Sequence, residues 1–293
     1  MIDADALSGP LLSLVIATLG RTDELNTLFD SLEAQTLRDF EVVVVDQNDD
    51  DRLVSVIAAR TGSFPIRHLR TPHERGLSRA RNRGLPIARG QILLFPDDDC
   101  WYPTTFLADA VALMDKWRCD VLAGRAARET GESINGRYEP QACRSDRTNA
   151  WTTGIEWVMF FRREVLDVIG GYAEDVGVGA STPWQACEGV DIVMRANAAG
   201  FVCWFDPALA GHHAEIVVAS PNAATRRKAR AYGRGMGHVL RRFEFGISDK
   251  LRWLLRPGAG AILSLVRGRT AMSRYYVQVA MGRFEGLLGR TLD

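Results

Sequence analysis

Three adjacent carboxylates, Asp97, Asp98 and Asp99, follow an apolar run at residues 91–95 after a single proline, Pro96. Neighbouring carboxylates repel one another, and they are costly at the mouth of a buried strand unless a cation neutralises them. Hard oxygen ligands suit Mg²⁺ or Mn²⁺. Because side chains alternate along an extended segment, Asp97 and Asp99 are expected on one side and Asp98 on the other. The pattern predicts a divalent-cation site, with a solvated turn as the alternative.

The elements that must position these carboxylates are short apolar runs that alternate with segments of helical period. The runs span residues 11–18, 40–45, 66–69 and 91–95, and the helical segments span 22–35, 53–58 and 77–89. Thr22 stands at the expected N-cap of the first helix, and Pro86 should kink or shorten the third. Strands that are apolar on both faces and alternate with helices indicate a parallel sheet covered on both sides, which is an α/β fold.

Ligands of such sheets bind beyond the carboxyl ends of the strands. Asp46 ends the second run and the three aspartates end the fourth, so these carboxylates should converge on one crevice. No GxGxxG follows the first run, and the chain has no GxxxxGK[ST]. The sequence therefore disfavours a dinucleotide oxidoreductase and a P-loop enzyme.

Composition agrees with a soluble enzyme. The 293 residues are 46% hydrophobic and 25% charged, with a mean hydropathy of −0.09, which excludes a disordered, collagen-like or multi-span membrane protein. The acidic, polar first ten residues do not resemble a signal peptide. The five cysteines form no CxxC pair and indicate a reducing compartment rather than a disulfide framework or a zinc site; they are Cys100, Cys119, Cys143, Cys187 and Cys203.

A net charge of zero conceals an acidic body and a basic tail. From Asn222 onward the chain has fifteen Lys and Arg against four Asp and Glu. Trp and Leu residues, such as Trp253, lie between the arginines, a mixture suited to an anionic membrane surface. The same tail could bind the pyrophosphate of a lipid-linked acceptor, pack as a helical lid, or present a solvated basic face. No motif for binding nucleic acid accompanies the charge.

Together these segments resemble an inverting family-2 glycosyltransferase of the GT-A fold, from about residue 11 to residue 242. The matching pieces are VIATLGR, EVVVVDQND, ERGLSRARNRGL, LLFPDDDCWYP, GGYAEDVGVGASTPWQACEGVDIVMRANAAGF and the stretch from HHAE to YGRGMGHVLRR. The resemblance implies a Rossmann-like, mostly parallel sheet with helices on both faces. It places a catalytic domain at 1–221, with a donor half at about 11–125 and an acceptor half at 126–221. A basic helical extension follows at 222–293.

The resemblance assigns the donor, a nucleoside-diphosphate-sugar with UDP or dTDP favoured, to the first half of the sheet. Thr18 and Arg21 follow the first strand, where a base and a diphosphate could be bound. Asp46 would accept a hydrogen bond from the imide of the base, or serve merely as a turn or N-cap residue. Arg81 would bind phosphate, or be a surface arginine.

The same resemblance makes the three aspartates a DxD motif that holds the donor diphosphate through Mn²⁺ or Mg²⁺. Asp97 and Asp99 would ligate the metal, and Asp97 and Asp98 would also contact the donor. A histidine often follows a later strand in the family; here the expected strand is 201–205, followed by Pro207. His213 is favoured over His212 by its spacing from that proline, and a core or surface histidine is the alternative.

The catalytic base is where this sequence departs from the family. The family has an Asp directly after Glu188, but this chain has Gly189. Glu188 is therefore the preferred base, and Asp191, which could instead pair with Arg195 one helical turn on, is second. Trp184 is a candidate platform for a sugar ring, or a packing residue.

The sequence thus predicts a metal-dependent, inverting hexosyl- or deoxyhexosyl-transferase. Its acceptor would be a cell-surface glycan or a polyprenyl-linked lipid in the assembly of cell-envelope polysaccharide. It would act in the cytoplasm or at the inner face of the plasma membrane. A catalytically silent nucleotide-sugar-binding module is the alternative that Gly189 motivates. A glycosidase would leave the aspartate cluster unexplained, and a nucleotidyltransferase would release pyrophosphate.

Overall fold

The computed structural model describes residues 9–292; the first eight, on which part of the signal-peptide expectation rests, lie outside the described residues. The chain divides into two compact units. The sheet unit comprises Met1–Arg75, Arg79–Tyr172 and Ile192–Glu215, and the helical unit comprises Gly76–Ser78, Ala173–Asp191 and Ile216–Asp293. No helix within the described range is long and apolar enough to cross a bilayer.

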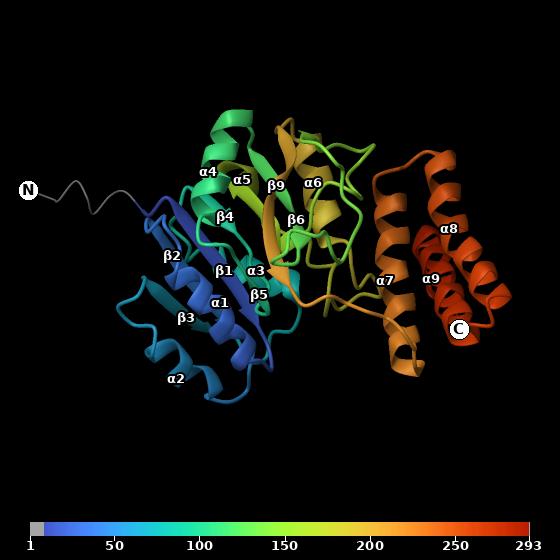
Figure 1. Cartoon of the computed structure of the whole chain (residues 1–293), viewed down its shortest axis with the longest axis horizontal. Coiled ribbons are helices and arrows are strands. Elements are labelled where there is room, and N and C mark those ends of the chain that lie inside the picture. Colours follow the sequence, from blue (N-terminus) through green and yellow to red (C-terminus); the bar gives the residue numbers. More distant parts are fainter. Residues whose placement is uncertain (1–8, 293) are drawn as a thin grey trace, which may run out of the picture. The chain divides into compact units, whose positions relative to one another are not determined.

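The sheet unit is built on one sheet in the order β3-β2-β1-β4-β8-β6-β9-β5, with β7 beside β9 (Figure 1). The strands are β1 (Leu12–Thr18), β2 (Phe40–Asp46), β3 (Ile66–Arg70), β4 (Ile92–Leu94), β5 (Cys100–Trp101), β6 (Val121–Ala127), β7 (Cys143–Arg144), β8 (Met159–Arg162) and β9 (Cys203–His213). The first four are parallel, as predicted. The second half is mixed, because β8 runs antiparallel to both β4 and β6. The predicted α/β architecture is confirmed.

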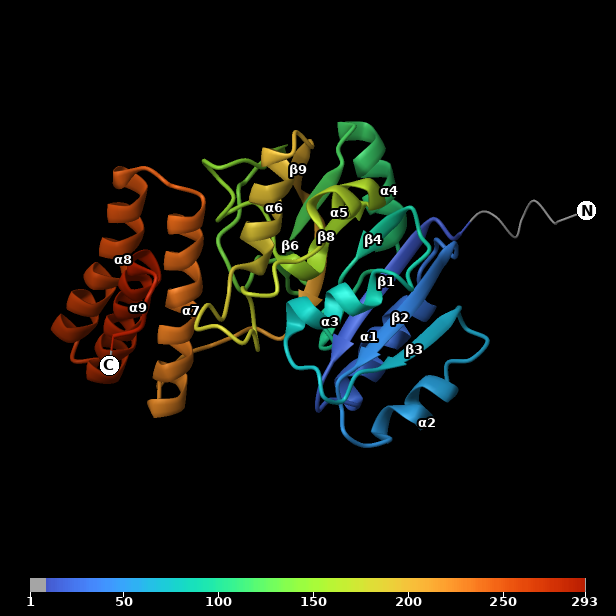
Figure 2. The same ribbon diagram turned by 180° about the vertical axis from the view of Figure 1, so that it is seen from behind.

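Helices cover both faces of this sheet (Figures 1 and 2). They are α1 (Asp23–Glu33), α2 (Arg52–Ala58), α3 (Leu77–Gly84), α4 (Phe106–Trp117), α5 (Arg163–Ile169) and α6 (Glu188–Ala198), with a 3₁₀ turn η2 (Glu156–Val158). Alternate side chains of β1 serve the two faces: Leu14 and Ile16 join the core formed with α1, α2 and α4, whereas Val15 faces α3. A Cβ at Gly84 would lie 2.3 Å from Val15, so α3 packs directly on the sheet.

Prolines and a cap residue were expected to set the ends of three elements, and the structure agrees with only some of these expectations. Helix α3 ends at Gly84, before Pro86, as predicted. Thr22 occupies the N-cap position of α1, but its side chain makes no capping hydrogen bond. The strand expected at 201–205 is instead β9, which continues past Pro207 to His213. The register between β6 and β9 shifts near this proline, and such a shift accommodates a residue that lacks an N–H.

The helical unit contains α7 (Ala223–Arg242), α8 (Ile247–Val266) and α9 (Thr270–Leu288). Asn222 caps α7 by accepting a hydrogen bond from the Thr225 N–H. Glycines let α7 and α9 approach closely: a Cβ at Gly237 would lie 2.1 Å from the Arg283 carbonyl oxygen, and one at Gly282 would lie 2.0 Å from the Arg230 carbonyl oxygen. Any larger residue would force these backbones apart.

One buried acid joins the same two helices. Glu285 of α9 is fully buried and accepts hydrogen bonds from Arg230 and Arg234 of α7, the second at 2.6 Å. The Leu292 N–H donates a further hydrogen bond to Glu285, at 2.8 Å. Arg230 and Arg234, two basic residues of the tail, therefore pair with a buried acid inside the helical unit.

Candidate active site

The sheet brings the carboxyl ends of three neighbouring strands together. Thr18 at the end of β1 pairs in register with Asp46 at the end of β2. On the other side of β1, Ala17 forms an isolated parallel bridge with Asp97, just beyond β4. The convergence predicted for these residues follows from the parallel pairing of β2, β1 and β4.

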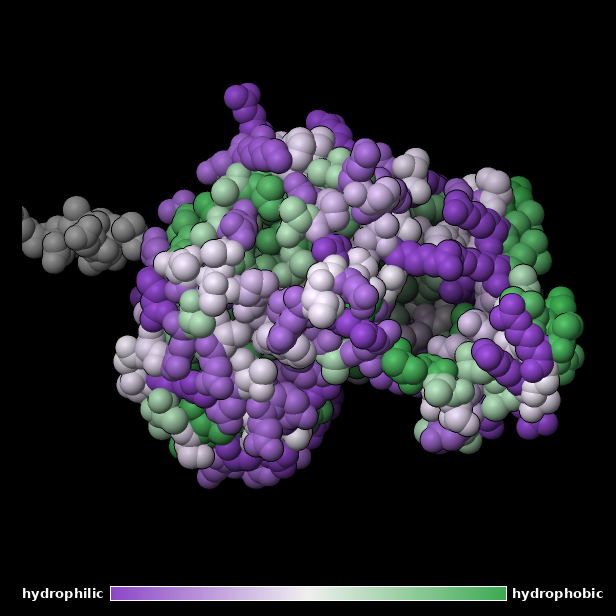
Figure 3. Space-filling model, in the orientation of Figure 1, coloured by the Kyte–Doolittle hydropathy of each residue, from purple (hydrophilic) through white to green (hydrophobic). Residues whose placement is uncertain are grey.

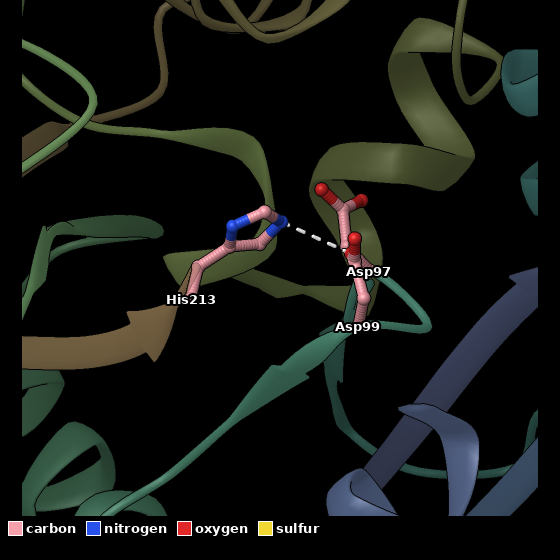
Figure 4. A group of neighbouring side chains, drawn as sticks. All are labelled: Asp97, Asp99 and His213. Atoms are coloured by element: carbon pink, nitrogen blue, oxygen red, sulfur yellow. Dashed lines mark hydrogen bonds and ion pairs between the residues drawn. The ribbon is translucent and has the colours of Figure 1, made fainter. Parts of the chain in front are cut away.

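A histidine from a distant strand meets two of the three aspartates. Oxygen atoms of Asp97 and Asp99 and a ring nitrogen of His213 all lie within 4.8 Å of one another (Figure 4). The His213 Nε2 is 3.0 Å from the Asp99 Oδ1. Antiparallel pairing of β5 with β9, with Cys100 opposite His213, holds the histidine there. Two carboxylates and one imidazole are a donor set that suits Mn²⁺.

The neighbouring histidine points elsewhere. His212 is buried, and its Nδ1 lies 3.0 Å from the Ala127 carbonyl oxygen on β6. Alternation along β9 therefore separates the two histidines that the sequence left open, and it is His213 that faces the aspartates.

The ionisation of this cluster reflects burial first and charge crowding second. The pKa of Asp97 is raised to about 6, chiefly because the carboxyl is removed from water, and Glu156 and the adjacent aspartates add to the rise while Arg81 opposes it. Burial also raises the pKa of Asp98, against the effect of Arg21. Crowded carboxylates of this kind are stabilised by a bound cation.

The pKa values of Asp99 and His213 shift in the directions expected of an acid and a base that are hydrogen-bonded to each other. Burial acts to raise the pKa of Asp99, but the hydrogen bond from His213 and the charges of His213 and Arg21 outweigh it, so the pKa is lowered. The pKa of His213 is raised, first by its hydrogen bond to Asp99.

Arg21, which follows β1, lies between two of the aspartates. Its guanidinium contacts the carboxylate of Asp98, and its Nη2 is 2.8 Å from the Asp99 Oδ2. This half-exposed side chain supplies a positive charge beside the cluster, where a diphosphate could also be bound. Asp98 is not part of the group that Asp97 and Asp99 form with His213, although Arg21 contacts both Asp98 and Asp99.

Arg81 is not a surface arginine. Only 1% of its side chain is exposed, and its Nη2 lies 3.1 Å from the Asp97 Oδ1. Its guanidinium also lies 4.9 Å from the centre of the Tyr172 ring. Helix α3 thus directs a fixed charge at the first aspartate of the cluster. The sequence did not single out Tyr172, because nothing in the chain's spacing links it to α3.

Asp46 makes both a turn and a side-chain contact. Its Oδ1 accepts hydrogen bonds from the backbone and side-chain nitrogens of Asn48, each at 2.8 Å, which is the turn that the sequence kept as an alternative. Its Oδ2 lies 2.9 Å from the Nε2 of His68 on β3. His68 was missed from the sequence, although the parallel pairing of the second and third apolar runs could have indicated it.

The three remaining candidates belong to the helical unit. Trp184 is 8% exposed and stacks on His238 of α7, with ring centres 4.8 Å apart, which favours the packing alternative over a sugar platform. Asp191 is fully buried, and its Oδ1 is 3.4 Å from the Nη1 of Arg242 on α7. Glu188 is the first residue of α6 and is also buried.

Helix α7 packs tightly on the loop that leads to Glu188. A Cβ at Gly235 would lie 2.3 Å from the carbonyl oxygen of Ala186. Cys187, which follows Ala186 in the chain, has a left-handed backbone with φ of 78°. This conformation costs a residue other than glycine about 1–3 kcal/mol. The surrounding packing must therefore hold this turn, and so the start of α6, in place.

Comparisons with known sequences identify the family of this chain. Residues 13–170 match the sequence model of Glycosyl transferase family 2. A PGL/p-HBAD biosynthesis glycosyltransferase of Mycobacterium bovis is 28% identical over 222 residues, covering 74% of this chain and 78% of that protein. An uncharacterized glycosyltransferase of Haemophilus influenzae is 35% identical over 94 residues, covering 32% of this chain and 31% of that protein, so the match spans about a third of its length.

Solved structures share the fold. A mannosyltransferase from Pyrobaculum calidifontis, in complex with GDP-Man and Mn²⁺, aligns with a TM-score of 0.66 at 17% identity, over 97% of this chain and 88% of that one. TarS of S. aureus in complex with UDP-GlcNAc aligns with a TM-score of 0.56 at 16% identity, over 95% and 92%. Because the family model covers more than half of the sequence, the chain belongs to Glycosyl transferase family 2 and is a glycosyltransferase.

Proposed function

We propose that this glycosyltransferase is metal-dependent and inverting, and that it moves a hexosyl or deoxyhexosyl group from a nucleoside-diphosphate-sugar to a cell-surface glycan or a polyprenyl-linked acceptor. The observation that carries the proposal is the grouping of Asp97, Asp99 and His213 at the carboxyl ends of the strands. The complexes of the structural neighbours with GDP-Man and Mn²⁺ and with UDP-GlcNAc support a donor of this class.

In this proposal Asp97, Asp99 and His213 hold Mn²⁺ or Mg²⁺. The bound ion would offset the negative charge that develops on the leaving nucleoside diphosphate. Arg21 lies beside the same aspartates and would bind a phosphate oxygen directly. Arg81 is buried against Asp97 and would act mainly by keeping that carboxylate ionised and oriented, because burial alone raises its pKa.

Beyond the metal group, Thr18 and Asp46 would bind the base of the donor, with UDP or dTDP favoured. They lie in register on adjacent strands, and Asp46 is a buried carboxylate already oriented by Asn48 and His68. Orientation before binding reduces the entropy that a ligand contact costs.

For the catalytic general base we propose Glu188. Its carboxylate would take the proton of the acceptor hydroxyl as that oxygen attacks the anomeric carbon. Asp191 is the weaker candidate because it is fully buried and its carboxylate faces the cation of Arg242. The helix macrodipole favours an anionic carboxylate at Glu188, the first residue of α6. The packing of α7 on Ala186 supports a fixed position for that residue.

The test is metal-dependent release of nucleoside diphosphate from a panel of donors, measured for the wild type, Glu188→Gln and Asp191→Asn. We expect Glu188→Gln to reduce transfer at least about a hundredfold, the usual range for a lost general base, while donor binding measured by calorimetry is retained. Asp191→Asn is the matched control and should affect stability more than turnover. Release of pyrophosphate, or full activity in EDTA, would contradict the proposal.

The second candidate, a silent binding module, rests on Gly189. It predicts metal-dependent donor binding without turnover on any acceptor. Gly189→Asp separates the two functions, because it restores the family's carboxylate: a gain of activity from zero supports the module, and a small change in an already active enzyme supports Glu188.

A further inference from the structure

Helix α8 carries an exposed row of large aliphatic side chains. The five residues of this row, here called the α8 stripe, are between 49% and 79% exposed; they are Ile247, Leu251, Leu255, Ile262 and Val266. At 3.6 residues per turn, all five fall within an arc of about 100° around the helix. Figure 3 shows hydrophobic side chains gathered along the edge where Figure 1 places α8.

The stripe is not the result of a loosely attached helix, because the opposite face of α8 is packed. Pro257, Ala261 and Ser264 on that face are buried. The Trp253 ring lies there too, 5.7 Å from the guanidinium of Arg283 on α9. Helix α8 is thus held by one face and leaves the other, aliphatic face to the solvent.

Basic residues flank one edge of the stripe. On the same helical wheel, Arg252, Arg256 and Arg267 follow the apolar arc at about 140° to 200° from Ile247. All three are exposed, and Asp249 is the one acidic residue in the sequence of α8. An apolar face edged by arginines is the pattern of helices that lie in the interface of anionic membranes.

From this arrangement we infer that the α8 stripe docks the protein on an anionic lipid surface, with the aliphatic side chains in the acyl boundary and the arginines among the headgroups. A second copy of this chain is a poorer partner for the α8 stripe. A two-fold contact through the stripe would bring the same row of arginines from both copies together. The inference does not depend on the proposed reaction, since it concerns residues outside the candidate active site.

The experiment is co-sedimentation of the full chain with phosphatidylcholine vesicles, with and without a phosphatidylglycerol fraction of about one third. The test variant is Leu255→Glu/Ile262→Glu. Its matched control is Val54→Glu/Val168→Glu, which places the same charges on exposed valines of α2 and α5. Circular dichroism and sedimentation velocity of each protein report folding and oligomeric state.

We expect binding to the anionic vesicles at low salt, weakened by high salt. Leu255→Glu/Ile262→Glu should lower the partition coefficient at least about a hundredfold, since each buried aliphatic side chain contributes about tenfold. The control pair should leave it within about twofold. Arg267→Gln, an exposed change, should lower it by about fivefold.

Three results would overturn the inference. The first is a wild type that ignores anionic vesicles at low salt. The second is an equal loss of binding in the control pair. The third is a stripe variant that dissociates a dimer but still binds vesicles, because the occupant would then be a second copy. Donor hydrolysis, measured in parallel without vesicles, should be the same for wild type and stripe variant, so a failed vesicle test would leave the proposed reaction untouched.

Discussion

The two units of this protein hold their polar groups in different ways. In the sheet unit, backbone pairing of strands far apart in sequence aligns Thr18, Asp46 and Asp97, and the side chains then meet at strand ends. In the helical unit, glycines set how closely α7 approaches its neighbours, and Glu285 ties α7 to α9. The first arrangement gathers three carboxylates beside Arg21, Arg81 and His213 at a place where a cation could bind. The second neutralises the buried charge of Glu285 with two arginines. Substitutions in the aspartate cluster should therefore affect function, and substitutions at the contact of α7 with α9 should affect stability.

The largest expected effect is on function in the sheet unit. Asp99→Ala removes a carboxylate that faces both His213 and Arg21, so metal-dependent donor binding and turnover should fall at least about a hundredfold. Asp98→Ala, the matched control, should do less, because Asp98 lies outside the group formed with His213. Calorimetry with Mn²⁺ and donor measures both. Equal, small losses for the two variants would refute the metal assignment.

Next is the stability of the helical unit. Gly237→Val places a side chain where even a Cβ would lie 2.1 Å from the Arg283 carbonyl oxygen, so α7 and α9 must separate. Overpacking typically lowers the free energy of unfolding by about 1–3 kcal/mol, and this variant should lose more than that. Thermal and urea unfolding measure it. A variant as stable as the wild type would show that the close contact of α7 and α9 is not required.

The buried acid gives a pH-dependent effect. The pKa of Glu285 is lowered to about 2; burial opposes the shift, but hydrogen bonds from Arg230, Arg234 and the Leu292 N–H prevail. A lowered folded-state pKa contributes stability that is complete above the unfolded value near 4.5 and is lost as pH falls toward 2.

Glu285→Gln should remove that pH dependence together with the stability. Unfolding measured between pH 5 and about pH 2 should show a shallower slope for the variant than for the wild type. Parallel slopes would mean that other carboxylates govern acid unfolding.

The smallest expected effect is a gain. Gly258 lies inside α8, and a Cβ there would meet nothing within 4 Å. Gly258→Ala should stabilise the protein by about 0.5–1 kcal/mol through helix propensity alone. It is also the control for Gly237→Val, since both replace a helical glycine. A large loss of stability would indicate a contact that the structure does not contain.

The sequence predicted the sheet unit well because its signals are local. Unbroken apolar runs identified the parallel strands, and Asp46 and Asp97 were recognisable because each follows such a run. Local patterns could not reveal that β9 continues past Pro207 or that Trp184 stacks on His238, since both depend on partners distant in sequence. The identity of the catalytic base and the domain limits remain predictions.

The basic tail was the hardest region to predict. Its charge left a membrane surface, an acceptor pyrophosphate, a helical lid and a solvated basic face open. In the structure Arg230 and Arg234 turn inward to Glu285, while Arg252 and Arg256 flank the α8 stripe. Composition alone cannot separate arginines used in packing from arginines available to a partner, because the distinction depends on which helix face each one occupies.

The close approach of Gly235 to Ala186 has a practical consequence for anyone who trims this protein. A version that stops near Ser220 would lose α7, and with it the ring that covers Trp184 and the cation that faces Asp191. The loop before α6 would then expose the Trp184 indole and lose one cation beside the buried Asp191 carboxylate, changes that favour aggregation and local unfolding. The last seventy or so residues are thus a built-in brace for that loop rather than a detachable appendage, and inactivity of a shortened version would say nothing about membranes or acceptors.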